Sequence, residues 1–438
     1  MPSRRAVLTG LAAGGVVAAG GYTVLASSTD PEPLPDATPG PDDWPAAGYD
    51  ARNTRYNAAA SVPRSKPENR WSVDFDHCYD PFVRGDRVVL NAEQRMVGIR
   101  EQDGERVWRS EWEPWGMETP TLGAERAYVT GVDCVFGVDL ATGDRTWHGD
   151  PCRGANTASG TIADGRLYLE HGGYFSALDA TGQAKWATTS DARGSPAIDD
   201  DTAFVATAFT VEAVDLTTPA REWPWEDRDD DEPPHTDRDA ATRWSEPTDG
   251  RINGPRFYWS PAVTDSTVYA TAEREDAPGG ELRALDRASG DERWAVASPP
   301  RRRPGEEPRD APDPVGRPVA PVVTDDRVVT SLGDRVLRAF SYDGTGGWTH
   351  SFDHAVTELA GAGDTLVAVT HDRSVGLKGP GHGTVHALDL ASGRVLWSWS
   401  IEHHFEGLAL TDGRIYTTRG IDRQRDEDLV GERLLALA

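Results

Sequence analysis

Lysine is almost missing from this chain. Only Lys66, Lys185 and Lys378 occur, so arginine supplies the other 42 of the 45 basic residues, and 72 acidic residues bring the net charge to -27. This charge excludes nucleic acid as a partner, because phosphate binding requires a basic face. An acidic surface with little lysine suits a high-salt medium, in which salt screens the repulsion between hydrated carboxylates. We therefore expect a haloarchaeal or similarly salt-adapted protein.

Cysteine is also scarce, with Cys78, Cys134 and Cys152 as the complete set. The sequence has no adjacent cysteines and no Cys-x-x-Cys-His motif, which excludes a c-type haem attachment site. An oxidising compartment would permit a disulfide between Cys134 and Cys152. Neither the geometry nor the redox state follows from sequence, so the bonded and free forms both remain open. We expect Cys78 to be a buried filler.

Long apolar runs are absent except near the N-terminus, where residues 6–26 are rich in alanine, glycine and valine behind Arg4 and Arg5. This pattern predicts that residues 1–26 are a twin-arginine-type export signal or, if uncleaved, a membrane anchor. Paired arginines hold the N-terminus inside, so we expect the remaining chain to lie outside the cytoplasm, secreted or anchored. Contact with the membrane would involve this segment alone. Residues 27–43, rich in proline and acid, are expected to be a solvated linker.

Tryptophan, by contrast, recurs with a period of roughly 40 residues, which is typical of a propeller blade. Each unit contains two short apolar runs around an Asp/Gly turn, a third run such as Leu282–Asp286, a turn of the Ala-Ser-Gly290 kind, and a strand with the tryptophan. These features predict four antiparallel strands. The tryptophans that end the units are predicted to be Trp108, Trp147, Trp186, Trp223, Trp294, Trp348 and Trp397.

Eight units can be aligned on their opening residues. The frames begin at Pro81, Pro120, Gly160, Pro196, Pro261, Pro321, Leu359 and Leu408. The last unit stops at Ala438 without a tryptophan strand, whereas residues 69–73 form a tryptophan strand with no unit before it. Pairing these two ends removes an open sheet edge. We predict an all-β fold over residues 44–438: an eight-bladed β-propeller of four-stranded antiparallel blades, closed by an N-terminal strand that completes the last blade.

Two stretches depart from the period. The distance from Trp223 to Trp294 exceeds the period by about 30 residues, and the excess includes the acidic segment 226–239. A second excess, residues 301–314, follows Trp294 and is rich in arginine and proline. Both compositions are typical of solvated loops, and we expect them to flank the fifth blade.

The units resemble the propeller repeat of the pyrroloquinoline quinone (PQQ) type, Pro-x4-Gly-x2-Tyr, Ala-Leu-Asp-x2-Thr-Gly and Trp. Residues 44–57, Trp-Pro-Ala-Ala-Gly-Tyr-Asp-Ala-Arg-Asn-Thr-Arg-Tyr-Asn, resemble the segment that precedes the ring in such proteins. At the level of the repeat, the chain is similar to the propeller lipoprotein of the bacterial outer-membrane barrel-assembly machinery and to quinoprotein alcohol dehydrogenases. The first resemblance implies a scaffold. The second implies a PQQ and calcium site with adjacent cysteines, which this chain lacks, so no catalytic residue is carried over.

Polar residues directly ahead of the frames are expected at one mouth of the central channel, because the first strand of each blade faces that channel. Carboxylates there could hold calcium, and a tryptophan could stack on a planar ligand, or the whole set could simply face water. The histidines predict no metal site, since His382 and His386 on one strand would lie about 13 Å apart. The candidate residues for a ligand or partner, called the channel-mouth residues below, are Asp80, Glu118, Trp259, Arg317, Glu358 and Glu406.

The function predicted from these features is that of an exported, non-enzymatic propeller that binds a protein or peptide outside the cytoplasm, with no cofactor. The alternative is a quinoprotein-like oxidoreductase that uses PQQ and calcium at the channel mouth. Recognition of a sugar or another small ligand is a third hypothesis. An enzyme needs several ligands converging on one point, whereas a scaffold needs an exposed patch, and sequence does not distinguish these arrangements.

Overall fold

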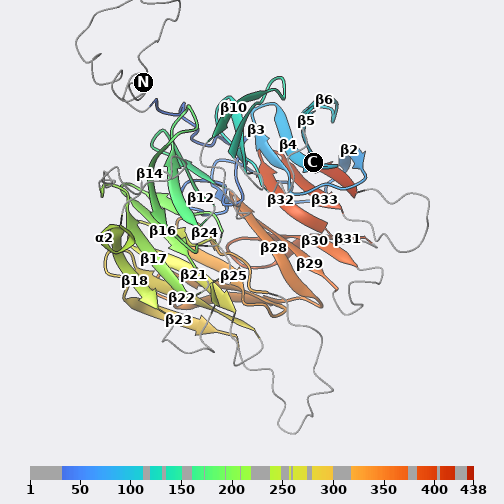
Figure 1. Ribbon diagram of the computed structural model, residues 1–438. Helices are drawn as coiled ribbons and strands as arrows, with labels where there is room; N and C mark the ends of the chain where they lie inside the picture. The colour runs from blue at the N-terminus through green and yellow to red at the C-terminus, as the bar shows by residue number, and fades with distance from the viewer. Residues whose placement is uncertain are drawn as a thin grey trace, which may run out of the picture. The chain divides into compact units, whose positions relative to one another are not determined.

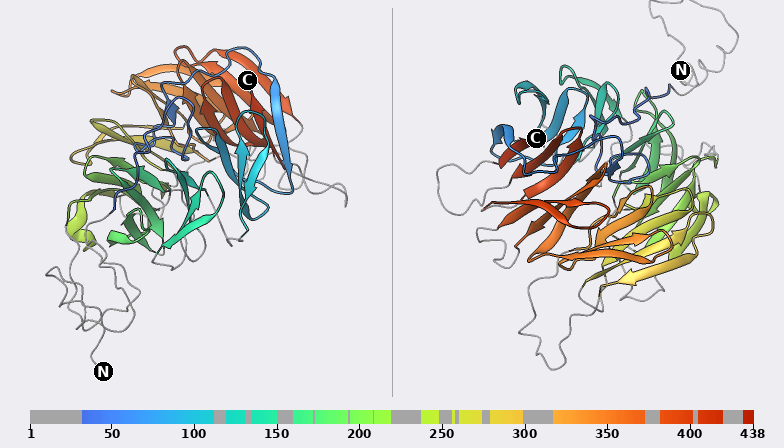
Figure 2. Two further views of the ribbon diagram at one scale, coloured as in Figure 1. Left: turned by 90° about the horizontal axis from the view of Figure 1, so that it is seen from above. Right: turned by 180° about the vertical axis from the view of Figure 1, so that it is seen from behind.

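The computed structural model describes residues 32–438 except 112–118, 131–134, 150–159, 172, 193, 208, 219–236, 248–255, 258–259, 274–278, 299–316, 373–381, 402–404 and 420–431. Residues 1–32 and 33–438 are separate units, and the second contains the fold. It holds eight sheets that follow one another along the chain (Figure 1, Figure 2). The predicted all-β, eight-bladed propeller is confirmed.

Each sheet contains a four-stranded antiparallel blade, and the blades are numbered 1 to 8 in chain order of their innermost strands. Blade 1 contains β3 (Phe82–Arg84), β4 (Arg87–Ala92), β5 (Arg95–Arg100) and β6 (Arg106–Arg109), and blade 2 contains β7 (Thr121–Leu122), β8 (Arg126–Thr130), β9 (Val135–Asp139) and β10 (Arg145–Gly149). Blade 3 contains β11 (Thr161–Ala163), β12 (Arg166–His171), β13 (Tyr174–Leu178) and β14 (Ala184–Thr189), and blade 4 contains β15 (Ala197–Asp199), β16 (Thr202–Ala206), β17 (Thr210–Asp215) and β18 (Thr242–Pro247). Blade 5 contains β20 (Ala262–Val263), β21 (Thr267–Glu273), β22 (Gly280–Asp286) and β23 (Glu292–Ala297), and blade 6 contains β24 (Val322–Val323), β25 (Arg327–Ser331), β26 (Val336–Ser341) and β27 (Gly346–Ser351). Blade 7 contains β28 (Ala355–Ala362), β29 (Thr365–His371), β30 (Gly383–Asp389) and β31 (Val395–Ile401), and blade 8 contains β32 (Phe405–Thr411), β33 (Arg414–Arg419), β34 (Glu432–Leu437) and β2 (Asn69–Phe75).

Three short elements lie outside this pattern. β1 (Tyr56–Asn57) pairs in parallel with β28, and β19 (Arg256–Phe257) pairs with β21 in blade 5. The short helix α2 (Arg238–Ala241) precedes β18 and begins at Asp237, whose side chain accepts a hydrogen bond from the amide of Asp239.

Burial falls from the centre of each blade outward, as the residue pattern requires. In blade 5, the second strand β21 is buried from Thr267 to Ala272, whereas the outermost strand β23 alternates between exposed and half-buried residues. Strands covered on both faces need a continuous run of small and β-branched residues, and outer strands do not. The alternation visible in the sequence therefore marks the outer strands.

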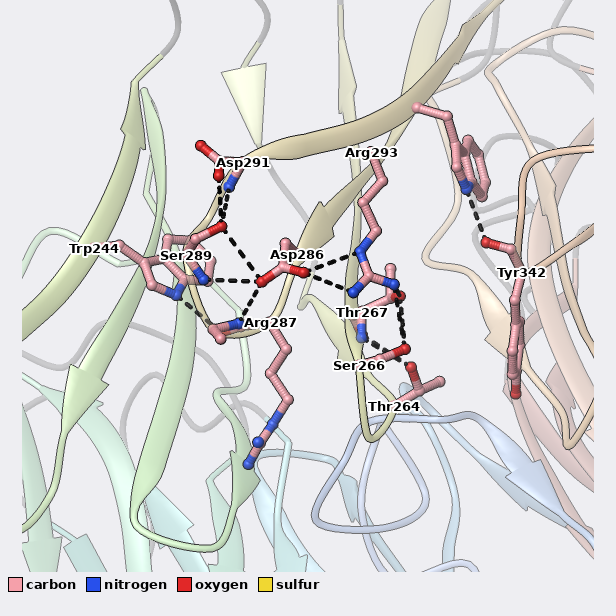
Figure 3. Close-up of polar contacts among 12 residues, drawn as sticks. Trp244, Thr264, Ser266, Thr267, Asp286, Arg287, Ser289, Asp291, Arg293 and Tyr342 are labelled. Atoms are coloured by element: carbon pink, nitrogen blue, oxygen red, sulfur yellow. Dashed lines mark hydrogen bonds and ion pairs between the residues drawn. The ribbon is translucent and has the colours of Figure 1, made fainter.

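The turn between the third and fourth strands is fixed by an aspartate (Figure 3). In blade 5 the Asp286 carboxylate accepts hydrogen bonds from the amides of Ala288 and Ser289 at 2.9 and 3.0 Å and pairs with Arg293 at 2.6 Å. The hydrogen bond from Arg293, with those from the turn amides, lowers the pKa of Asp286 to about 2. Gly290 then takes a φ of 79°, which a side chain would strain.

This turn also holds the neighbouring blade. The tryptophan ring of one blade lies against the turn glycine of the next, so a Cβ added at Gly290 would approach the Trp244 ring to 2.6 Å. The indole N–H of Trp244 donates to the carbonyl of Arg287 at 2.9 Å (Figure 3). The same indole-to-carbonyl bond joins other neighbouring blades through Trp71, Trp108, Trp186, Trp294 and Trp348, whereas Trp397 of blade 7 donates to the carbonyl of Pro63 in the segment that precedes the ring. The spacing of tryptophan and glycine in the sequence is therefore set by contacts between blades.

Ring closure follows the prediction. β2 pairs antiparallel with β34, with Asn69 opposite Leu437 and Phe75 opposite Glu432. Arg433 on β34 forms an ion pair with Asp74 on β2 at 2.5 Å. The N-terminal strand thus completes blade 8 and covers an edge that would otherwise be open.

One predicted blade boundary is wrong. The fourth strand of blade 4 is β18 and its tryptophan is Trp244, which pairs with Ala213 on β17. Trp223 lies outside the described residues, in a segment that joins the third strand to the fourth. The Asp-Leu-Thr-Thr-Pro sequence after β17 lacks the turn glycine, so the chain does not return directly. The acidic excess therefore lies within blade 4, whereas residues 299–316 connect blades 5 and 6 as expected.

The predicted signal or anchor and residues 27–31 of the linker lie outside the described residues, as do Cys134 and Cys152. The rest of the linker is described and is not wholly solvated, because Leu34 is buried and its amide donates to the carbonyl of Gly165 at 2.7 Å. In the described part of the chain, no helix is both long and apolar enough to cross a membrane. Cys78 is buried, with 1% of its surface exposed, in agreement with its predicted role as a filler.

Candidate functional site at the channel mouth

A single non-repeating segment, residues 44–63, crosses the centre of the ring and is called the axial segment below. In the left view of Figure 2, the dark-blue chain lies across the middle of the blades. Its backbone carbonyls accept hydrogen bonds of 2.7–3.0 Å from the innermost strands of six blades. The donors occupy the third position of each repeat frame and are the amides of Val83, Leu122, Ile198, Val263, Val323 and Gly361.

This arrangement defines two faces of the ring. In each of these six blades the third position of the frame donates to the same axial segment, so the innermost strands of these blades run in the same direction. Each of them begins at one face, called the mouth face below, and ends near the axial segment. In an antiparallel blade the second strand returns to the mouth face, so the link between second and third strands lies there too.

Buried amides fix the axial segment. Asn53, 3% exposed, donates through Nδ2 to the carbonyls of Ser195 and Pro261 at 3.0 and 3.2 Å. Its φ of 55° is left-handed, which asparagine tolerates better than most residues. Asn57, fully buried, donates to the carbonyls of Pro41 and Asp43 at 3.1 and 3.2 Å. The asparagines in the sequence 50–57 therefore have a structural reason.

Arg55 carries a positive charge into the centre of the ring. It is half-buried, its φ is 52°, and its carbonyl accepts the amide of Gly361 at 2.9 Å. Burial, the largest effect, lowers the pKa of the Arg55 guanidinium, while the nearby carboxylates of Glu358 and Asp80 raise it. A half-buried cation is thus balanced by a carboxylate within β28 and another just before β3.

The structure brings together two of the predicted channel-mouth residues, Asp80 and Glu358, because both interact with Arg55. Gly407 on β32 also lies against Asp80, since a Cβ added there would approach Asp80 Oδ1 to 2.6 Å. Arg317 instead forms an ion pair with Glu273 at the end of β21, at 3.3 Å, and its side chain is exposed.

The other predicted residues are less fully defined. Glu118 and Trp259 lie outside the described residues. The backbone of Glu406 pairs with Thr418 in blade 8, and its side chain is outside the description. Arg55 itself was not predicted, because it belongs to the non-repeating segment and not to a repeat position. Its location between two asparagines of the axial segment was the available signal.

Two large hydrophobic side chains are exposed in the described part of the chain, and both lie on the mouth face. Tyr79, 42% exposed, precedes β3, and Phe209, 55% exposed, lies in the link between β16 and β17. The Tyr79 ring meets the edge of His77 at 4.5 Å, and His77 Nδ1 lies 2.9 Å from Glu432 Oε1. The described residues of the mouth face therefore combine exposed aromatics with carboxylates.

The described residues do not fit a calcium–quinone site. None of them belongs to a group of three or more histidine, cysteine, aspartate or glutamate side chains able to hold a metal ion. Asp80 and Glu358 already interact with the guanidinium of Arg55, so a bound Ca²⁺ would compete with a fixed cation for both carboxylates. The axial segment provides that cation from within the fold.

Sequence comparison gives the family. A family model described as "Outer membrane protein assembly factor BamB" matches residues 51–148, 92–226 and 235–421, which is most of the ring. The chain belongs to this family. No curated protein sequence matches the chain.

Solved structures show the fold of this BamB-family chain in more distant proteins. BamB from Moraxella catarrhalis is 15% identical, with a TM-score of 0.56, over 85% of this chain and 97% of that one. Quinohemoprotein alcohol dehydrogenase from Comamonas testosteroni is 14% identical, with a TM-score of 0.62, over 90% and 80%. A europium-containing methanol dehydrogenase is 12% identical, with a TM-score of 0.62, over 91% and 98%. At these identities the similarity concerns the fold alone.

Proposed function

We propose that this BamB-family propeller is a scaffold that binds a protein or peptide on its mouth face, outside the cytoplasm. The observation that carries the proposal is the exposure of Tyr79 and Phe209 on that face. Exposed aromatic residues supply contact area at little entropic cost and are enriched where proteins bind one another. The family's description as an assembly factor is consistent with this role.

The balance of charge at the centre favours a scaffold over a cofactor enzyme. The guanidinium of Arg55 interacts electrostatically with Asp80 and Glu358, so a bound cation would compete with it for both carboxylates. In the alternative, a quinoprotein-like oxidoreductase, the same carboxylates would have to bind calcium next to that guanidinium. Repulsion between the two cations makes this arrangement costly.

Export is the part of the proposal that depends on sequence alone. Arg4 and Arg5, followed by the apolar residues 6–26, support twin-arginine export or anchoring. A net charge of -27 supports a salt-adapted source, so binding is best assayed in high salt.

The experiment is partner capture with the full chain, compared with a double variant, Tyr79→Ala with Phe209→Ala. A captured protein would be purified and its affinity for both chains measured by calorimetry. We expect the double variant to weaken binding at least about 30-fold, because two aromatic anchors are lost. Val296→Ala on the outer strand β23 is the control and should bind as the wild type does.

A second titration addresses the alternative. PQQ is added to the full chain in high salt with calcium, while quinone absorbance and the melting temperature are followed. No saturable binding is expected. Tight binding at one equivalent that Glu358→Gln abolishes would favour the oxidoreductase and overturn the scaffold proposal.

A further inference from the structure

The outermost strand of blade 7, β31, is a long edge without charge. It runs Val-Leu-Trp-Ser-Trp-Ser-Ile from Val395 to Ile401 and pairs with β30. No other strand in the described part of the chain pairs with its outer edge. A sheet edge presents unpaired N–H and C=O groups, so a long edge without charge is a template for another strand.

The other outer edges carry residues that discourage such pairing. Proteins protect edge strands with charged side chains, with proline, or by keeping the strand short and weak. β27 begins with Gly346 and Gly347, which weaken a strand, and β18 ends at Pro247. The remaining outer strands carry charges at Arg70 and Asp74, Arg106 and Arg109, Arg145, Lys185, and Glu292 and Arg293. β31 has none of these protections.

The side chains of β31 are engaged within the ring, which leaves its main chain as the feature that a partner would meet. Trp397 Nε1 donates to the carbonyl of Pro63 at 2.8 Å, and the Trp399 ring lies 5.8 Å from the ring of Phe405. Ser398 Oγ lies 2.8 Å from His386 Nδ1, and Ser400 Oγ lies 2.9 Å from Thr384 Oγ1. These contacts hold the strand against its neighbour, with one irregularity in the register opposite Ala387 and Leu388.

The ladder indicates which main-chain groups face outward. In blade 5, the amide of Ser298 donates inward to the carbonyl of Gly280 at 2.9 Å, so the preceding residue, Ala297, has its main-chain groups on the free edge. Ser400 is the equivalent of Ala297, because each lies three residues after the tryptophan of its strand. Both residues are exposed.

We propose that β31 binds an extended segment of another protein, which adds a strand to the outer edge of blade 7. Main-chain hydrogen bonds would supply the affinity, and alternate side chains of the segment would pack beside the strand. The segment would lack acidic residues, because the chain carries a charge of -27 and repels both an acidic strand and a second copy of itself. This inference rests on the proposed scaffold function and names how the scaffold would hold a partner.

The probe is a synthetic peptide of alternating threonine and valine with an arginine at each end, titrated against the full chain by fluorescence anisotropy. Ser400→Pro removes the outward N–H and keeps the inward ladder, so it should weaken binding about tenfold. Ala297→Pro is the matched control on β23, and Ser400→Ala controls for the lost hydroxyl. Both controls should bind as the wild type does, and hydrogen exchange should show peptide-dependent protection at residues 395–401.

Several outcomes would overturn the proposal. They are equal binding by Ser400→Pro, protection confined to other strands, binding by a peptide N-methylated at alternate residues, and self-association of the chain that Ser400→Pro abolishes. Failure of the peptide to bind, with capture at Tyr79 and Phe209 retained, would reject the β31 site and keep the mouth-face scaffold. Loss of partner capture at the mouth face, with peptide binding retained, would reject the scaffold proposal as stated.

Discussion

The axial segment and the mouth face differ in the residues that the blades present to them. Near the axial segment, equivalent amides from six blades converge on one irregular stretch, whose carbonyls pair with them. At the mouth face, the described residues include carboxylates around Arg55 and exposed aromatics at Tyr79 and Phe209. Repetition thus provides identical donors that a single segment can satisfy, while function requires residues that differ between blades. We expect changes near the axial segment to cost stability and changes at the mouth face to cost binding.

The largest expected effect is loss of the ring itself. Deleting residues 44–73 removes the axial segment and β2, which exposes the edge of β34 and leaves the converging amides without partners. We expect aggregation, measured by size-exclusion chromatography with light scattering. Deleting residues 1–31 serves as the control and should leave a monodisperse ring. A stable, monodisperse product from the larger deletion would contradict closure by strand exchange.

The next effect is expected at Asn53. Asn53→Ala removes two hydrogen bonds to buried carbonyls and places alanine at a φ of 55°, so we expect a loss of about 2 to 4 kcal/mol in the free energy of unfolding. Asn53→Gly relieves the backbone strain and should lose less. Denaturant titration in high salt measures both, with the exposed Asn69→Ala as the control. Equal stability of Asn53→Ala and wild type would show that the hydrogen bonds of Asn53 in the axial segment do not stabilise the ring.

Arg55 tests the boundary between the two faces. Arg55→Met leaves the carboxylates of Asp80 and Glu358 without their counter-ion, so we expect a loss of about 2 kcal/mol at neutral pH. This loss should shrink as the pH falls and the carboxylates take up protons. Arg317→Met breaks only an exposed ion pair and should cost less than about 0.5 kcal/mol. If the loss of stability in Arg55→Met did not vary with pH, it would come from lost packing of the side chain and not from its charge.

His386 provides a pH test away from both faces. Burial, followed by the effect of His350, lowers the pKa of His386 from 6.5 to about 4. The neutral ring therefore contributes stability above pH 6.5 that is lost as the pH falls toward 4, on the order of 2 kcal/mol. His386→Gln should remove this dependence, measured as unfolding free energy at several pH values, whereas the exposed His382→Gln should keep it. An unchanged dependence in His386→Gln would place the titrating group elsewhere.

The smallest effect on stability is expected at the mouth-face aromatics. The double variant Tyr79→Ala with Phe209→Ala removes exposed rings, so its free energy of unfolding should stay within about 0.5 kcal/mol of wild type while partner binding falls. Thermal denaturation beside the capture assay measures the two quantities. A large loss of stability would mean that these rings belong to the structural part of the ring.

The accuracy of the sequence predictions follows from the same contrast. The blades, their count and the closing strand were predictable, because tryptophan and turn glycine recur for contacts that every blade makes. Trp223 was wrongly assigned because the turn after β17 lacks glycine and a long segment separates it from Trp244. Asp80 and Glu358 occupy equivalent repeat positions and both interact with Arg55, which was missed because it occurs once. A residue that occurs only once leaves no repeating pattern in the sequence from which its role could be predicted.

The axial segment has one more consequence. Its carbonyls accept the blade amides in chain order, from Trp44 with Val83 to Arg55 with Gly361. A ring with one blade more or fewer would offer these amides at different angles, and the same short stretch of chain could no longer meet them in turn. The short stretch from Trp44 to Arg55 therefore sets the number of blades, and gene duplication within the repeats would be tolerated only together with a change in this stretch.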